Sequence, residues 1–195
     1  MAEPLSVVLH AAKGAGDLMG KRVLITGCGP IGMLAIIVAR AAGAEEIVAT
    51  DVTPFTLGKA QEIGADAVHN VAEESDPFPA YSADKGHFDV LFECSGVAAA
   101  LASTIPAMRP GATIMQLGLG GEMMLPVQAM TAKELQLRGS FRFHEEFFTA
   151  VRMMQRERLD VKPLITHSFP VAEAIPAFEM AADRNQAIKA QIEFA

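Results

Sequence analysis

The feature that most constrains this chain is a glycine-rich turn between a short apolar run and an alanine-rich stretch. The run Arg22-Val23-Leu24-Ile25-Thr26 is typical of a buried strand, and Gly27-Cys28-Gly29-Pro30-Ile31-Gly32 follows it directly. A helix is expected from Ile31 to Ala42, closed by Gly43. Three glycines spaced G-x-G-x-x-G at a strand-to-helix turn are typical of a loop that holds a pyrophosphate.

Each residue of this turn has a physical reason to be there. Gly27 permits the tight turn, Gly29 lets the backbone approach a phosphate, and Gly32 lets the helix pack closely on the strand. Pro30 suits the first helical turn, where its missing N–H costs nothing. Ile31 comes next, and its amide is one of the free donors at the start of the helix. We therefore expect these five residues to bind a dinucleotide. The alternative is an ordinary strand–turn–helix corner.

Asp51 is the second candidate binding residue. It ends the next apolar run, Glu46 to Asp51, 19 residues after Gly32. A carboxylate at this point can accept hydrogen bonds from both hydroxyls of an adenosine ribose and would repel a 2′-phosphate, which favours NAD over NADP. The alternative is a helix N-cap on the following turn. Methyltransferases that use S-adenosylmethionine also have an acid after a glycine-rich loop, so the pair alone does not decide the cofactor.

Short apolar runs alternate with helical stretches along most of the chain. Near-continuous apolar strands separated by helices predict a parallel sheet covered on both faces, hence a doubly wound α/β fold of the Rossmann type. Strands are expected at residues 22–27, 46–51, 67–70, 89–94, 112–117 and 134–141. Helices are expected at 31–42, 55–63, 97–108, 145–159 and 171–182, with a turn at 110–111, a largely irregular stretch at 71–87 and an extended stretch at 163–169. A strand is expected at 187–194, within a short C-terminal strand and helix return segment.

Two further loops follow strands and contain glycine. They are Glu93-Cys94-Ser95-Gly96 and Gln116-Leu117-Gly118-Leu119-Gly120-Gly121. In a parallel sheet both emerge at the edge where the first glycine loop lies, and ligands of such sheets bind there. We expect Cys94, Ser95, Leu117, Gly118 and Leu119 to border a nicotinamide and its ribose. The alternative for each loop is plain turn chemistry.

Composition excludes several classes of function. The formal charge of −7 gives no counterion release on DNA, so nucleic acid is not an expected partner. No apolar run reaches the roughly 18 residues that span a bilayer, and no secretion signal is recognisable, so no membrane partner is expected. Cys28 and Cys94 are too few for a disulfide framework, and both suit the role of small apolar fillers. A cytoplasmic location is expected.

The residues resemble a known family over nearly the whole chain. The segments that carry the resemblance are Glu3-Pro4-Leu5-Ser6-Val7, Gly29-Pro30-Ile31-Gly32-Met33, Glu62-Ile63-Gly64-Ala65-Asp66, Glu93-Cys94-Ser95-Gly96 and Val161-Lys162-Pro163-Leu164. The chain resembles the cofactor domain of zinc-dependent medium-chain dehydrogenases, in the sorbitol dehydrogenase branch. Within that branch, Gly139-Ser140-Phe141-Arg142-Phe143 and Ala190-Gln191-Ile192-Glu193-Phe194 are most similar to members that oxidise a sugar acid. The resemblance implies hydride transfer from a polyol or sugar acid to NAD.

The resemblance also implies roles for individual residues. Glu3 falls beside the catalytic zinc in such enzymes, and Phe141 and Arg142 fall near nicotinamide and substrate, so Glu3 and Arg142 are the catalytic candidates. A guanidinium suits a sugar acid because it can hold a carboxylate by two charge-assisted bonds; the alternative for Arg142 is a surface cation. Thr56 departs from the family, which carries Arg or Lys there near the adenosine.

The chain begins where the cofactor domain of such enzymes begins. We therefore expect residues 1–20 to be a lead-in from an absent catalytic domain, 21–160 the Rossmann domain, and 161–195 a return segment that packs on the absent domain. Zinc is expected only in the full-length enzyme and this chain alone is expected to be inactive, because its five histidines lack the spacing of a metal site. The tail strand is expected to lack its partner and to promote association, and a homo-oligomer is expected.

Two other interpretations remain open from the residues. A module that binds NAD(H) without chemistry would explain the glycine fingerprint but would leave Glu3 and Arg142 without a role. A methyltransferase would share the fingerprint and Asp51, but the Gly29-Pro30-Ile31-Gly32 turn and the glycine-rich loop at 118–121 disfavour it.

Overall fold

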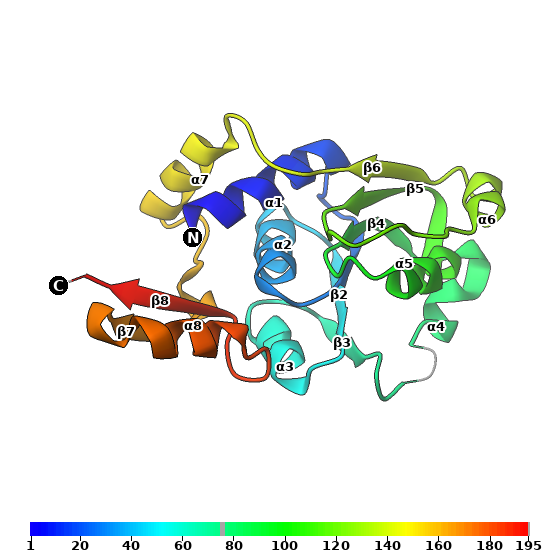
Figure 1. Cartoon of the computed structure of the whole chain (residues 1–195). Coiled ribbons are helices and arrows are strands. Elements are labelled where there is room, and N and C mark those ends of the chain that lie inside the picture. The colour runs from blue at the N-terminus through cyan, green and yellow to red at the C-terminus, as the bar shows by residue number, and fades with distance from the viewer. Residues whose placement is uncertain (75–76, 195) are drawn as a thin grey trace.

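A computed structural model describes residues 1–74 and 77–194 and contains a six-stranded parallel sheet in the order β3-β2-β1-β4-β5-β6 (Figure 1). The order reverses between β1 and β4, which is the doubly wound arrangement predicted from the sequence. The strands are β1 (Arg22–Thr26), β2 (Glu46–Asp51), β3 (Ala67–Asn70), β4 (Phe88–Glu93), β5 (Met108–Gln116) and β6 (Gln136–Gly139). A separate pair consists of β7 (Ile165–Pro170) and β8 (Lys189–Glu193).

Helices connect these strands and cover the sheet. They are α1 (Ala2–Ala15), α2 (Pro30–Ala41), α3 (Pro54–Glu62), α4 (Pro79–Ser82), α5 (Ala98–Thr104), α6 (Val127–Ala132), α7 (Glu146–Gln155) and α8 (Ala174–Ala182). Short 3₁₀ turns are η1 (Ala83–Lys85), η2 (Ile105–Ala107), η3 (Lys162–Leu164) and η4 (Val171–Glu173). Within the described residues, no helix is long and apolar enough to cross a membrane.

The central strands β1, β2 and β4 are mostly apolar because both of their faces are buried, whereas the edge strand β6 is exposed. In β1, Val23 and Ile25 belong to the core cluster that includes α1, α2 and α3, whereas Leu24 belongs to the cluster beneath α5 and α6. The same alternation continues in β4, where Phe92 faces the first cluster and Leu91 the second. This two-sided burial produces the near-continuous apolar runs from which the parallel sheet was predicted.

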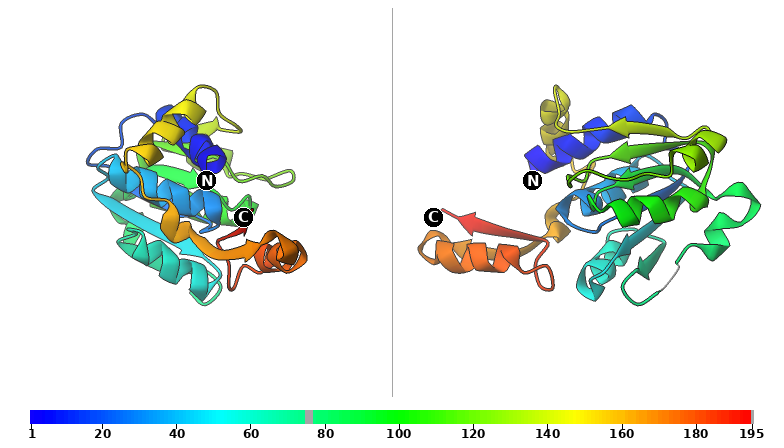
Figure 2. Two further views of the ribbon diagram at one scale, coloured as in Figure 1. Left: turned by 90° about the vertical axis from the view of Figure 1, so that its left-hand side faces the viewer. Right: turned by 45° about the vertical axis from the view of Figure 1, so that its right-hand side comes forward.

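The first 15 residues form a helix that the sequence patterns did not reveal. Leu5, Val8 and Ala11 of α1 are fully buried in the first core cluster. The helix lies against α2 and α7, as the left view of Figure 2 shows. The lead-in expected at residues 1–20 is therefore an integral layer of this fold.

Two predicted boundaries are wrong around β5. The helix expected to reach Met108 ends as α5 at Thr104, because Pro106 lies in the 3₁₀ turn η2, and Met108 begins β5. The turn expected at Pro110-Gly111 lies inside β5, where Phe88 pairs with Met108 but Val90 pairs with Thr113. The extra residues form a bulge on one strand, and Gly111 has a positive φ of 78° there.

The irregular stretch predicted at residues 71–87 is largely confirmed. It contains only the short elements α4 and η1 among its described residues. Residues 75–76 of this stretch lie outside the described part of the chain.

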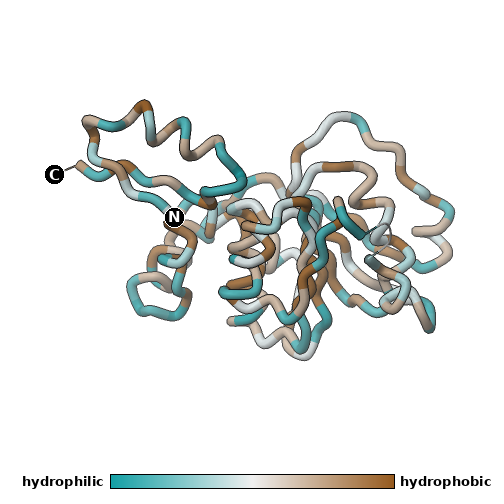
Figure 3. The backbone as a smooth tube through the Cα atoms, turned by 90° about the horizontal axis from the view of Figure 1, so that it is seen from below, coloured by the Kyte–Doolittle hydropathy of each residue, from teal (hydrophilic) through white to brown (hydrophobic). Residues whose placement is uncertain are grey.

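The tail forms a β7–α8–β8 unit that projects from the main sheet as a lobe (Figure 2, right). The expectation that the tail strand lacks a partner is wrong, because β8 pairs in parallel with β7 and α8 makes the crossover. Apolar residues concentrate in the central strands and are only scattered along the lobe (Figure 3). Ile175 and Phe178 of α8 remain 75% and 73% exposed.

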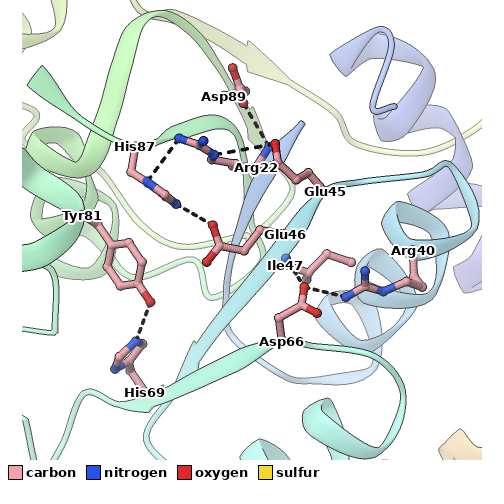
Figure 4. A network of polar contacts seen from close by, with 10 residues as sticks. All are labelled: Arg22, Arg40, Glu45, Glu46, Ile47, Asp66, His69, Tyr81, His87 and Asp89. Carbon is pink, nitrogen blue, oxygen red and sulfur yellow. Dashed lines mark hydrogen bonds and ion pairs between the residues drawn. The ribbon is translucent and has the colours of Figure 1, made fainter. Parts of the chain in front are cut away.

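A polar network ties the amino-terminal ends of the central strands (Figure 4). The backbone N–H of Arg22 donates to Asp89 over 3.0 Å, and the Arg22 side chain lies 3.5 Å from His87. His87 in turn lies 2.5 Å from a carboxylate oxygen of Glu46. The network lies at the edge opposite the glycine-rich turn, so it supports the sheet rather than the candidate site.

The glycine at the start of α2 gives the first testable prediction. A Cβ atom at Gly32 would lie 1.9 Å from the carbonyl oxygen of Gly27. Gly32→Ala is expected to lower the free energy of unfolding by about 3 kcal/mol, because neither backbone segment can yield without moving the helix off the strand. Urea titration followed by circular dichroism would measure the change.

Gly58→Ala is the matched control, because Gly58 lies in α3 and a Cβ atom there would have no neighbouring atom within 4 Å. This variant is expected to gain about 0.5–1 kcal/mol from helix propensity. Equal effects of the two substitutions would contradict the proposed close packing.

Candidate functional site

The carboxyl-terminal ends of five parallel strands lie side by side at one edge of the sheet. Because neighbouring strands are in register, the loops after them follow the strand order β2, β1, β4, β5, β6. The predicted site residues lie along this edge in that order, namely Asp51, then Gly27 to Gly32, then Cys94 and Ser95, then Leu117 to Leu119, then Phe141 and Arg142. Ligands of doubly wound sheets bind at this edge, where the strand order reverses.

The three glycines of the turn differ in what the fold requires of them. Gly27 has a positive φ of 84°, and a Cβ atom there would lie 2.8 Å from the amide nitrogen of Ser95. Gly29 has an ordinary φ of −71°, and no atom lies within 4 Å of a Cβ built on it. The fold itself therefore needs Gly27 and Gly32 but leaves open space at Gly29. That space fits a ligand that contacts the backbone.

The start of α2 offers free donors beside this space. Gly29 is the N-cap and provides no side-chain acceptor, and Pro30 is the first helical residue. The amides of Ile31 and Gly32 lie in the first turn, where an α-helix has no internal partners for them. These amides and the helix dipole together favour an anion such as a pyrophosphate.

Asp51 joins the end of β2 to the glycine-rich turn. One carboxylate oxygen accepts a 2.6 Å hydrogen bond from the amide of Cys28, and the other accepts from Val52 and Thr53 at 2.7 and 3.0 Å. The N-cap of α3 is Thr53, so the alternative role of Asp51 as that cap is not observed. The Asp51 carboxylate is therefore held next to the glycine-rich turn.

Thr56 has no contact with this carboxylate among the described hydrogen bonds. It is buried, and its hydroxyl donates over 2.8 Å to the carbonyl of Thr53 within α3. The cation that family members carry at this position is therefore replaced by a group that supports the helix start.

The two cysteines lie beside the site as neutral thiols. Burial raises the pKa of the Cys28 thiol, and the nearby Asp51 carboxylate adds to the shift. Burial likewise raises the pKa of Cys94 well above its usual value, with a further contribution from Glu93. A raised pKa favours the protonated thiol, which is a weaker nucleophile than the thiolate.

Glu93 is the site residue that sequence reasoning missed. Its fully buried carboxylate accepts hydrogen bonds from the Thr26 hydroxyl at 3.2 Å, from the Gln116 amide group at 2.6 Å and from the backbone amide of Ser95 at 2.9 Å. It also accepts from the Ser95 hydroxyl and from the amide of Gly96. A charged residue inside an apolar strand was the available signal, because a buried carboxylate needs donors around it.

The loops after β4 and β5 interlock through glycine. A Cβ atom at Gly118 would lie 2.1 Å from the amide of Gly96, and one at Gly120 would lie 2.2 Å from the Gly96 carbonyl. These glycines are required by the contact between two loops, not merely by turn geometry. The structure thus brings Ser95, Gly118 and Gly27 together, as the sequence predicted.

Large apolar side chains are exposed along the same edge. Val52, Val97, Leu119 and Phe141 come shortly after the ends of β2, β4, β5 and β6, and Leu119 and Phe141 are 78% and 63% exposed. Leu117, by contrast, is buried. Exposed apolar groups beside free backbone amides suit a ligand that has both flat rings and phosphates.

The catalytic candidates lie at different places. Phe141 and Arg142 follow β6, and the Arg142 guanidinium carbon lies 5.0 Å from the centre of the Phe141 ring. Arg142 is exposed and is not fixed by any ion pair within the described residues. Glu3 is exposed in the first turn of α1, and no described contact joins it to the strand-end loops.

A cleft of about 520 Å³ opens beside the end of β6, between α1 and α7. Its lining includes Ser140, His144 and Glu146, which flank the Phe141-Arg142 segment. The Glu146 carboxylate accepts a 2.8 Å hydrogen bond from the amide of His144, which lowers its pKa to about 2 even though burial opposes the shift. Glu146 therefore fixes the segment that carries the two candidate residues.

The described residues contain no group of three or more His, Cys, Asp or Glu side chains that could hold a metal ion. His10 and His144 approach each other with ring centres 5.4 Å apart, but they do not form such a group. The residues present therefore do not fit a catalytic zinc, whereas the open space at Gly29, the free amides and Asp51 do fit a dinucleotide.

The fold and the edge define a dinucleotide-binding domain, and comparison with known proteins identifies its family. Residues 30–156 match the family of zinc-binding dehydrogenases, and the chain belongs to that family. It is 41% identical over 194 residues to L-idonate 5-dehydrogenase (NAD(P)(+)) of Escherichia coli K12, covering 99% of this chain and 56% of that protein. Human sorbitol dehydrogenase is 39% identical over 184 residues, covering 92% of this chain and 51% of that enzyme.

The solved structure of L-idonate 5-dehydrogenase from Escherichia coli superposes with a TM-score of 0.92, over 99% of this chain and 56% of that one. The chain therefore spans about half the length of the relatives it matches. The family resemblance seen in the sequence is confirmed, and the methyltransferase alternative is excluded.

The contact of Glu146 predicts a pH-dependent stability. The pKa of Glu146 in the folded protein lies below its ordinary value of 4.5. The contribution of Glu146 to the free energy of unfolding is therefore fully present above about pH 4.5 and is lost as the pH falls toward 2. Glu146→Gln is expected to lower the free energy of unfolding by about 1.5–3 kcal/mol at pH 7. The difference from the unchanged protein should shrink as the pH falls from about 4.5 to 2.

Thermal unfolding at a series of pH values would measure this effect. Glu145→Gln is the control, because Glu145 is exposed and pairs only with Lys13 among the described ion pairs; it should change stability by less than about 0.5 kcal/mol. A Glu146 effect that stayed constant down to pH 2 would contradict the assignment.

Proposed function

We propose that this chain is the NAD-binding part of an oxidoreductase that transfers a hydride between a polyol or sugar acid and NAD. The observation that carries the proposal is the order of groups along the sheet edge. Along this edge lies first a carboxylate suited to a ribose, then free amides suited to a pyrophosphate, then glycine-rich loops suited to a nicotinamide. The parts of the dinucleotide follow one another in the same order. NAD supplies the ring carbon that accepts the hydride.

The preference for NAD over NADP rests on Asp51. Its carboxylate is held by Cys28, Val52 and Thr53, and each oxygen retains capacity to accept from a ribose hydroxyl. The same negative charge disfavours a 2′-phosphate, and Thr56 supplies no cation to offset it. The name of L-idonate 5-dehydrogenase (NAD(P)(+)) from Escherichia coli includes both cofactors, so binding of NAD and of NADP is compared in the experiment below.

The favoured substrate is L-idonate, oxidised to 5-keto-D-gluconate, with sorbitol or another polyol as the alternative. The identity with L-idonate 5-dehydrogenase supports the sugar acid. So does the exposed guanidinium of Arg142 after β6, which forms no ion pair among the described residues. A guanidinium binds a carboxylate more strongly than a neutral hydroxyl.

A dinucleotide-binding domain at residues 21–160 is followed by a return segment at 161–195, and the lead-in at residues 1–20 adds the helix α1 to the core of that domain. The exposed Ile175 and Phe178 on α8 suit the return segment's proposed contact with a catalytic domain. We place the zinc on residues of that domain, with Glu3 nearby, so this chain alone is expected to be inactive. The complete enzyme is expected to be a cytoplasmic homo-oligomer.

A stand-alone module that binds NAD(H) without catalysis is the second candidate. This candidate is favoured because all the strand-end loops that we propose to bind NAD(H) lie within this chain. Addition of the catalytic domain distinguishes the two functions, because turnover would then appear only for the oxidoreductase.

Substitution of Asp51 tests the cofactor proposal. Asp51→Ala is expected to weaken NAD binding roughly 10- to 100-fold, because two hydrogen bonds to a charged group are lost. NADP binding should change less than about threefold, because the repulsion of its phosphate is lost as well. Calorimetric titration of both cofactors would measure the difference, with Asp51→Asn as the variant that keeps an acceptor. Equal losses for the two cofactors would contradict the role of Asp51.

Substitution of Arg142 tests the substrate proposal in the complete enzyme. Arg142→Ala is expected to lower kcat/KM for L-idonate by about 10- to 100-fold and for sorbitol by less than about twofold. Arg152→Ala is the control, since Arg152 is an exposed arginine within α7. Steady-state kinetics with both substrates would measure the ratio, and an unchanged ratio would remove the reason for preferring a sugar acid.

A further inference from the structure

The buried carboxylate of Glu93 has no role in the function proposed above. It lies at the last residue of β4 with 0% exposure, beneath the loops at residues 94–97 and 117–121. Burying a carboxylate is costly unless donors surround it. Its hydrogen-bond partners come from three neighbouring strands, since Thr26 ends β1, Ser95 follows β4 and Gln116 ends β5.

We propose that Glu93 is a positioning residue that sets the shape of the nicotinamide half of the cofactor site. The inference rests on the proposed function, because it assumes that these two loops border the nicotinamide. Among the described hydrogen bonds, those of Glu93 come from Thr26, Ser95, Gly96 and Gln116, whereas those of Asp51 come from Cys28, Val52 and Thr53 on the adenosine side. The two halves of the site are thus held by two different carboxylates.

Most of the groups at this position require an acceptor. The Glu93 oxygens face the hydroxyls of Thr26 and Ser95, which donate to them here, and three N–H groups that can only donate, namely the backbone amides of Ser95 and Gly96 and the side-chain amide of Gln116. The Gln116 amide also donates over 2.9 Å to the carbonyl of Gly118, which fixes its orientation. A glutamine at position 93 would place an N–H₂ group against one of these donors.

The Glu93 carboxylate controls the positions of both loops because the loops pack too closely to move independently. Gly96 is bonded to Glu93 through its amide and has a positive φ of 71°. Gly118 and Gly120 both pack on the backbone of Gly96, closer than any Cβ atom would allow. A shift of Gly96 therefore moves the loop that carries Leu117 to Leu119 as well. The geometry of both loops depends on one group of hydrogen bonds.

The experiment compares two ligands on the same protein. NADH fills both halves of the site, whereas ADP-ribose lacks the nicotinamide ring and tests the adenosine and phosphate side. Glu93→Gln is expected to raise the Kd for NADH about tenfold and to change the Kd for ADP-ribose less than about twofold. Titrations followed by NADH fluorescence and by calorimetry would give the two constants.

A second measurement detects the change without any ligand. In the unchanged protein the amides of Ser95 and Gly96 donate to a buried carboxylate and should exchange slowly with solvent. In Glu93→Gln these two amides should exchange at least about tenfold faster, while the amides of Cys28 and Thr53, bonded to Asp51, should not change. Hydrogen exchange followed by NMR resolves these positions individually.

Thr104→Val is the control for general loss of stability. Thr104 is fully buried in α5, and its hydroxyl donates only to the Leu101 carbonyl among the described bonds, away from the two loops. It should affect NADH and ADP-ribose alike. If Glu93→Gln does not fold, Ser95→Ala removes one hydroxyl donor to Glu93 and should show the same difference between ligands to a smaller extent.

The outcomes separate the two proposals. A wild-type chain that is folded but binds neither ligand contradicts the proposed cofactor function itself. Wild-type binding of both ligands, with equal losses for NADH and ADP-ribose in Glu93→Gln, overturns the positioning role and leaves Glu93 as a general support of the fold. Selective loss of NADH together with faster exchange at Ser95 and Gly96 supports it.

Discussion

The close approach of α2 to β1 is the contact on which the rest of the site depends. At Gly32 the helix lies so near the Gly27 carbonyl that no side chain fits between them. This approach directs the free amides of the first helical turn at the sheet edge, and it fixes where the glycine-rich turn can lie. The other strand-end loops can contribute to the same site because they lie along the same edge of the sheet as this turn.

Two carboxylates stabilise this edge on either side of the turn. Asp51 reaches the turn through the amide of Cys28, and Glu93 reaches the residue just before it through the Thr26 hydroxyl. Both carboxylates accept from backbone amides, so both hold the strand-end loops in place. Loops that are held in this way lose less conformational entropy when a ligand binds.

The sequence predicted the sheet and the edge well because both rest on local patterns. Apolar runs, glycine spacing and the acid at Asp51 can be recognised from neighbouring residues in the chain, and the doubly wound fold followed from general rules of α/β topology. The helix α1 was missed because its apolar residues Leu5, Val8 and Ala11 become buried only against α2 and α7. The role of Glu93 was missed for the same reason, since Gln116 lies 23 residues away.

The lobe formed by β7, α8 and β8 has a consequence for the energetics of the whole chain. Its strands pair with each other and not with the six-stranded sheet, and its base is anchored in the main core by Leu164 and Ile188. Cooperative units of a protein open separately when few buried contacts join them. The lobe is therefore expected to open locally more often than the sheet, and the strand-end loops are expected to keep their shape while it does so.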